Sequence, residues 1–116
     1  MADILNLLLA LATIGFGAAG WLAPRWTMEK VDLRDGGSTM GLSEVRAASG
    51  ALFVVAGVGA ILIGFPAAYA MLGFVWGGGA LGRATSLLLD GRTTRKWGFF
   101  GTEIVFAVLL LGINLT

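Results

Sequence analysis

Six charged or polar residues lie within or beside long apolar stretches of this chain, where they could pair with one another or act on a ligand. They are Glu44, Arg46, Arg83, Ser86, Asp90 and Glu103. A single charge placed in hydrocarbon costs roughly a few kcal/mol, so such residues are candidates for function. An arginine beside a carboxylate could form a structural ion pair, an anion or lipid-headgroup pocket, or a site of proton exchange.

Composition narrows this choice. The chain has no cysteine and no histidine, so it lacks thiol nucleophiles, thiolate metal ligands and imidazole groups. It has one tyrosine and no pair of carboxylates at the spacing that acid–base catalysis uses. We therefore expect no catalytic residue, no metal site and no cofactor, and we predict that the protein is not an enzyme. A net charge of +1 suggests no nucleic-acid partner.

The elements that must position the six residues are four long apolar stretches. Hydrophobic residues make up 57% of the chain and charged residues only 13%, whereas about a quarter of a soluble domain is charged. Each stretch is close to the ~20 residues with which a helix crosses a bilayer, and the alternation of barrel strands is missing. We predict an all-α integral membrane protein, residues 1–116, with four transmembrane helices in one compact bundle. The predicted spans are about 4–23, 44–65, 67–89 and 97–116.

The first stretch has one alternative interpretation, a secretory signal, because small residues follow its apolar centre. Its leading region carries Asp3 and no basic residue, whereas signals normally begin with a basic region. We therefore favour a membrane span.

Basic residues predict the orientation of the bundle. The connections 24–43 and 90–96 contain Arg25, Lys30, Arg34, Arg92, Arg95 and Lys96, whereas the opposite side carries only Asp3. By the positive-inside rule, both connections are cytoplasmic and both termini lie on the non-cytoplasmic side. Trp21, Trp26 and Trp97 are predicted to anchor the helices at the membrane interface.

Two of the charges fall at the same depth. Arg83 lies six residues before the end of the third span and Glu103 six residues after the start of the fourth, about 9 Å in at 1.5 Å per residue. We predict that they face each other, that Ser86 or Ser49 adds hydrogen bonds, and that Arg46 is near enough to share the carboxylate. A polar clamp that fixes helix register is favoured. The alternatives are an arginine that reaches the headgroups by itself and a functional pocket.

Helical spacing predicts which faces carry these contacts. On the third span the face is Trp76, Gly79, Arg83, Ser86 and Asp90; on the fourth it is Phe99, Glu103, Phe106 and Leu110; on the second it is Arg46, Gly50, Phe53, Gly57 and Ile61. Ser43 is the expected N-cap of the second span. Gly91 is expected to close the third span in a left-handed conformation.

Glycines form the second pattern. The chain contains 19, many at the small-xxx-small spacing that lets helices approach closely in lipid. Those predicted to pack helices are Gly50, Gly57, Gly73, Gly77, Gly78 and Gly82. They serve either packing within the chain or the docking of another subunit.

Three groups of these residues resemble a known family: Glu44-x-Arg46-x-x-x-Gly50, then Gly82-Arg83-x-x-Ser86-x-x-x-Asp90-Gly91, and Glu103. In this combination, over nearly the whole length, the chain is similar to the bacterial small four-helix membrane proteins of domain of unknown function family 4345. The resemblance implies a multi-pass protein of the bacterial inner (cytoplasmic) membrane. It implies no established activity.

The leading functional hypothesis is a non-catalytic accessory or assembly subunit. Its glycine-rich helix faces would dock onto a larger membrane complex, such as a respiratory or photosynthetic one. The expected partners are membrane lipids and other membrane-protein subunits or further copies of the chain. The alternative is a small transporter, or a lipid- or anion-binding membrane protein, that uses the cluster around Arg83 and Glu103.

Overall fold

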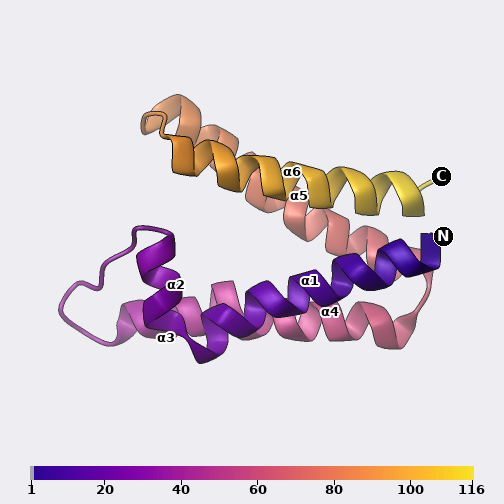
Figure 1. The fold of residues 1–116 in the computed structure, drawn as a ribbon, viewed down its shortest axis with the longest axis horizontal. Helices are drawn as coiled ribbons and strands as arrows, with labels where there is room; N and C mark the ends of the chain where they lie inside the picture. Colours follow the sequence, from indigo (N-terminus) through magenta and orange to yellow (C-terminus); the bar gives the residue numbers. More distant parts are fainter. Residues whose placement is uncertain (1) are drawn as a thin grey trace. The chain divides into compact units, whose positions relative to one another are not determined.

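The computed structural model describes residues 2–116, and every regular element in that range is a helix (Figure 1). The elements are α1 (Ala2–Leu22), α2 (Pro24–Lys30), α3 (Met40–Arg46), α4 (Leu52–Ile63), α5 (Pro66–Leu89) and α6 (Thr94–Asn114). A π-helical turn, Ala47–Ala51, joins α3 to α4 without a break, so Met40–Ile63 is one continuous helix of 24 residues. The all-α prediction is confirmed.

Three helices are long and apolar enough to cross a membrane: Ala2–Leu22, Met40–Ile63 and Thr94–Asn114. This agrees with a membrane protein. Helix α5 is also long, at 24 residues, but a run of three glycines and Arg83 interrupt its apolar sequence, and it is not among these three. The fourth crossing therefore stays a prediction.

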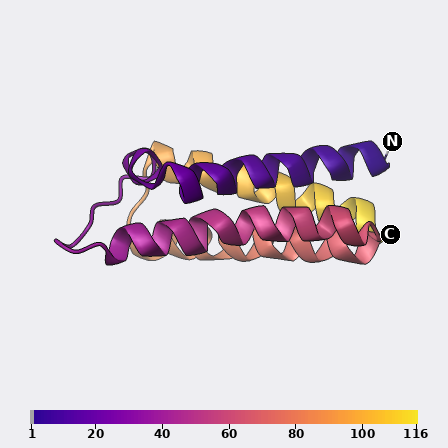
Figure 2. The same cartoon turned by 90° about the horizontal axis from the view of Figure 1, so that it is seen from below.

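Contacts between residues divide the chain into two units. The C-terminal unit contains the residues up to Leu9 together with Ile63–Thr116, and so holds the hairpin of α5 and α6. The N-terminal unit is Ala10–Leu62, in which the remainder of α1 lies alongside residues 40–62 of the second long helix (Figures 1 and 2).

The connection predicted at residues 24–43 contains more helix than expected. Helix α2 begins at Pro24, which tolerates the first helical position because its missing N–H would be unpaired there anyway. The second long helix begins at Met40, and its N-cap is Thr39 rather than the predicted Ser43. Ser43 is already inside the helix, because its N–H donates to the Thr39 carbonyl at 3.0 Å.

Local signals explain the ends of the C-terminal hairpin. Pro66 stands in the first turn of α5 after an extended Phe65, and α5 ends before Gly91, whose φ of +94° confirms the predicted left-handed glycine. Helix α6 begins at Thr94, earlier than the predicted 97. The reason is that the Thr93 hydroxyl caps it, accepting from the Lys96 N–H at 3.1 Å.

Candidate functional site

The predicted pair of opposite charges is present in the C-terminal unit. Nε of Arg83 donates to Oε1 of Glu103 at 3.1 Å, and Nη2 donates to Oε2 at 3.3 Å. The two side chains therefore meet as a fork on a fork, the geometry in which arginine and carboxylate bind most strongly. The Glu103 side chain is 13% exposed and that of Arg83 is 34% exposed, so the acid is the more deeply enclosed partner.

Neighbouring residues close the pair on two sides. The Phe99 ring lies over the guanidinium, with Cζ of Arg83 5.2 Å from its centroid, which adds a cation–π contact. On α5, a Cβ built on Gly79 would stand 2.8 Å from Oε2 of Glu103. Glycine at this position thus gives the carboxylate the room that it occupies, and both carboxylate oxygens are engaged.

The same helix faces continue away from the pair through apolar contacts. Trp76 stacks on Phe106 with ring centroids 4.5 Å apart at 42°. Further along, Leu110 is fully buried, and its Cβ would lie 3.0 Å from a Cβ built on Gly73. The face predicted on the fourth span is therefore the face with which α6 contacts α5.

Ser86 and Asp90 contribute to the end of α5 and not to the ion pair. The Asp90 N–H donates to the Ser86 carbonyl at 2.8 Å, and the Lys96 ammonium donates to the carbonyls of Asp90 and Gly91 at 3.4 and 2.8 Å. Among residues 2–116, no side-chain hydrogen bond joins Ser86 to Arg83 or Glu103, so that prediction is wrong. Ser86 lies one turn beyond Arg83, whose fork already engages both oxygens of Glu103.

Arg46 and Glu44 belong to the N-terminal unit. Nη1 of Arg46 donates to the Trp21 carbonyl at 2.7 Å. This carbonyl is in the last turn of α1, where carbonyls have no partner within the helix, so the arginine caps α1. Glu44 is exposed on α3. The sequence predicted a carboxylate partner for Arg46, and the structure provides a backbone oxygen.

Comparison with protein-family models identifies the family of the chain. The family model described as domain of unknown function (DUF4345) matches residues 1–113. The chain belongs to this family. No curated protein and no solved structure matches it.

In this DUF4345 chain the predicted packing glycines differ in what surrounds them. Gly50, Gly57 and Gly73 are tightly enclosed, because a Cβ on any of them would meet another atom within 3 Å. Gly77 would make only ordinary contact, at 3.8 Å from the Ala107 Cβ. A Cβ built on Gly78 or on Gly82 would have no atom within 4 Å outside its own stretch of helix. Gly78 and Gly82 therefore do not pack against the other helix of the hairpin.

Three further glycines, outside the six predicted to pack helices, are also enclosed; one of them, Gly79, was predicted on the contact face of the third span. Gly17 and Gly20 of α1 press against the backbone of the Met40–Ile63 helix: a Cβ on Gly17 would be 2.7 Å from the Gly50 carbonyl oxygen, and one on Gly20 would overlap Ser49. The third is Gly79, beside the ion pair. Their signal in the sequence is helical spacing, since Gly17 and Gly20 lie one turn apart on one face.

A pair of amides, also unpredicted, joins the two ends of the chain within the C-terminal unit. Asn6 and Asn114 each donate a side-chain N–H to the other's oxygen at 2.8 Å, and Asn114 also donates to the Leu110 carbonyl at 2.7 Å. Asn6 is only 4% exposed. The available signal was one asparagine near the start of the first predicted span and one near the end of the last.

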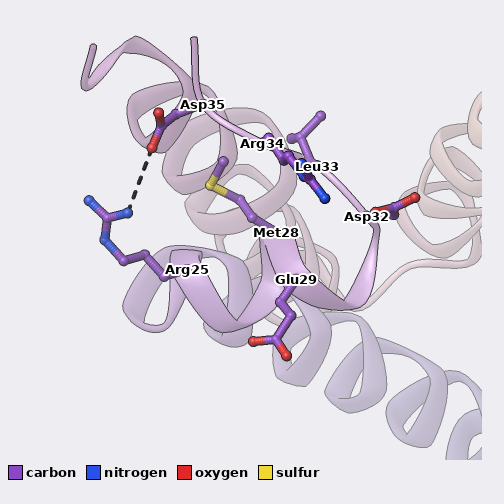
Figure 3. Close-up of a pocket in the computed structure, with 7 residues that line it drawn as sticks. All are labelled: Arg25, Met28, Glu29, Asp32, Leu33, Arg34 and Asp35. Carbon is purple, nitrogen blue, oxygen red and sulfur yellow. Dashed lines mark ion pairs between the residues drawn. The ribbon is translucent and has the colours of Figure 1, made fainter. Parts of the chain in front are cut away.

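Figure 3 shows a polar pocket of about 300 Å³ formed by α2 and the residues after it. Its lining residues are Arg25, Met28, Glu29, Asp32, Leu33, Arg34 and Asp35. Arg25 and Asp35 form an ion pair at 3.7 Å across it, and Asp32 adopts a left-handed φ of +58°. Charges of both signs share this pocket, so it selects for neither an anion nor a cation.

The three tryptophans predicted as interface anchors are all exposed. Trp21 and Trp26 flank the junction between α1 and α2, where the Lys30 ammonium lies 5.6 Å from the centroid of the Trp26 ring. Trp97 lies in the first turn of α6 and packs edge-on against Phe100, with ring centroids 6.0 Å apart. Their exposure is consistent with contact to the membrane interface, which stays a prediction.

Proposed function

We propose that this DUF4345 protein is a non-catalytic protein of the bacterial inner membrane that acts as an accessory or assembly subunit of a larger membrane complex. In this proposal the chain crosses the membrane four times, with α5 as the fourth crossing. Both termini lie on the non-cytoplasmic side, because the connections at residues 24–43 and 90–96 contain six basic residues.

The observation that carries the proposal is the closed pair of Arg83 and Glu103. Proton exchange needs a carboxylate that can alternate between a proton and another partner, and an anion pocket needs an arginine whose charge is not already neutralised by a carboxylate. Here both oxygens of Glu103 accept from Arg83, and Phe99 lies over the guanidinium. The carboxylate fills the space beside Gly79, where a Cβ would be too close to it. The arrangement favours a clamp between two helices over transport or anion binding.

The open glycines of α5 support the docking role. Gly78 and Gly82 lie four residues apart, the spacing at which two helices in lipid approach most closely, and no atom lies within 4 Å of a Cβ at either. Gly73, one turn before Gly77 on the same helix, is filled by Leu110 and Leu111 of α6. We propose that an apolar helix of another membrane protein packs against Gly78 and Gly82.

The test compares two substitutions that add the same side chain at open glycines. The full-length protein is extracted from native membranes in mild detergent, and its companions are identified by mass spectrometry. We expect Gly82→Leu to lose a companion that the parent protein retains, and Gly112→Leu, on α6, to retain it. Recovery of the parent protein as a monomer or homodimer would refute the proposal, as would equal retention by both variants.

Transport predicts a different result. In liposomes, a proton-coupled carrier would show a substrate-dependent proton signal that Glu103→Gln abolishes. We expect no such signal from the parent protein or from the Glu103→Gln variant, because both carboxylate oxygens of Glu103 accept hydrogen bonds from Arg83.

A further inference from the structure

An open groove of about 600 Å³ lies in the N-terminal unit, between the end of α1 and the start of the Met40–Ile63 helix. Its lining residues are Trp21, Thr39, Leu42, Ser43, Arg46, Ala47 and Ala51. All but Trp21 follow the three- and four-residue spacing of one helix face. The lining contains one positive charge and no acid, in contrast to the mixed charges of the pocket in Figure 3.

Polarity changes along this groove in one direction. The hydroxyls of Thr39 and Ser43 and the guanidinium of Arg46 come first, with Leu42 as the one apolar side chain among them, and the small apolar residues Ala47 and Ala51 follow. Because Met40–Ile63 is long and apolar enough to span a membrane, this direction leads from the interface toward hydrocarbon. Trp21, an amphipathic ring of the kind that gathers at the interface, forms the opposite wall.

Arg46 is held in place and still has donors to offer. A guanidinium has five N–H groups, and one of Arg46's donates to the Trp21 carbonyl at 2.7 Å. Among residues 2–116 the side chain makes no other hydrogen bond and no ion pair. The hydroxyl of Thr39 is also not used as a helix cap. A guanidinium with unused donors, in a groove that also contains two hydroxyls, is suited to the oxygens of a phosphate.

We propose that this groove binds one anionic phospholipid. The phosphate is held by Arg46, Ser43 and Thr39, and one acyl chain lies along Ala47 and Ala51 against Trp21. A zwitterionic lipid fits less well, because no acid of the lining can pair with its amine. The site is separate from the pair of Arg83 and Glu103 and does not depend on the proposed subunit role.

Native mass spectrometry of the full-length protein in a non-ionic detergent tests this. The protein is titrated with phosphatidylglycerol and, separately, with phosphatidylethanolamine of the same acyl chains. We expect phosphatidylglycerol to bind about tenfold more tightly. Arg46→Gln should reduce its affinity to that of phosphatidylethanolamine, and Arg34→Gln, which removes an equal charge outside the groove, should leave it unchanged.

A second variant keeps the test independent of the helix cap that Arg46 provides. Ala47→Leu places a larger side chain in the apolar part of the groove and leaves the bond from Arg46 to Trp21 intact. We expect it to weaken phosphatidylglycerol binding several-fold. The proposal is overturned if the two lipids bind equally, if Arg34→Gln weakens binding as much as Arg46→Gln, or if Ala47→Leu has no effect. Binding of inorganic phosphate as tight as that of phosphatidylglycerol would also overturn it, because the groove would then recognise a free anion.

Discussion

The two units of this protein each place one arginine among apolar helices, and each gives it a different kind of partner. In the C-terminal unit Arg83 meets the carboxylate of Glu103. In the N-terminal unit Arg46 meets the carbonyl of Trp21. The first arrangement neutralises two charges and depends on both side chains. The second leaves a net positive charge at the end of a helix, where the helix dipole is favourable to it.

Glycines show the same contrast. In the N-terminal unit, Gly17, Gly20 and Gly50 bring backbone against backbone. In the C-terminal unit, the atoms around Gly73 and Gly79 belong to side chains of α6. A side chain can change its rotamer when a methyl group is added, whereas two packed helix backbones can only move apart. Small substitutions should therefore be more damaging in the N-terminal unit.

Among the substitutions that test this difference between the two units, we expect Gly20→Ala to lower the free energy of unfolding most. The new Cβ would overlap the carbonyl of Ser49, so α1 and its neighbouring helix must separate. We expect a loss of about 3 kcal/mol in the free energy of unfolding, the upper end for overpacking, measured by thermal unfolding in detergent. Gly15→Ala is the control, since nothing lies within 4 Å of a Cβ there. Equal melting temperatures for the two variants would contradict the backbone contact.

A smaller loss is expected when the ion pair is broken. Arg83→Ala leaves the more buried partner, Glu103, without its cation, whereas Glu103→Ala leaves an arginine that can reach toward water. We expect Arg83→Ala to cost about 2 kcal/mol and Glu103→Ala less, both read as reduced accumulation and a lower melting temperature. Exchange of the two residues should restore part of the loss. If neither single change affects folding, the pair is not a clamp.

The smallest effect should come from Gly73→Ala. Its new methyl group would meet Cγ of Leu111 at 2.9 Å and Cβ of Leu110 at 3.0 Å. Because Leu111 can adjust its side chain, we expect a cost of about 1 kcal/mol in the same unfolding assay. Gly78→Ala, in open space on the same helix, should cost nothing. A loss for Gly73→Ala as large as that for Gly20→Ala would remove the distinction between the two units.

Periodicity allowed most of the C-terminal hairpin to be predicted. Phe99, Glu103 and Leu110 recur at helical spacing, and this spacing predicted the face of α6 that contacts α5. An unpaired charge in hydrocarbon is costly, and this cost predicted Glu103 as the partner of Arg83. The left-handed Gly91 followed in the same way, from a local backbone requirement. Each of these depends on neighbours along one helix or on two helices joined by a short connection.

The partner of Arg46 and the pairing of Asn6 with Asn114 did not follow from such rules. Arg46 reaches the Trp21 carbonyl only because Gly20 and Gly50 bring two backbones into contact, and backbone oxygens leave no signature in residue types. The two asparagines are 108 positions apart, and an asparagine alone does not indicate which helix it will meet. The start of the second long helix at Met40 was not predicted, because the residues between Met40 and Ser43 indicate neither helix nor loop clearly.

The amino-acid sequence by itself determined that this chain folds into long apolar helices, and it favoured a pair between Arg83 and Glu103, because unpaired backbone groups and unpaired charges are both costly in hydrocarbon. Only the tertiary structure decided which glycines are filled, which stay open, and which oxygen receives Arg46. Those outcomes depend on how closely the helix backbones approach one another, and no residue type specifies that separation.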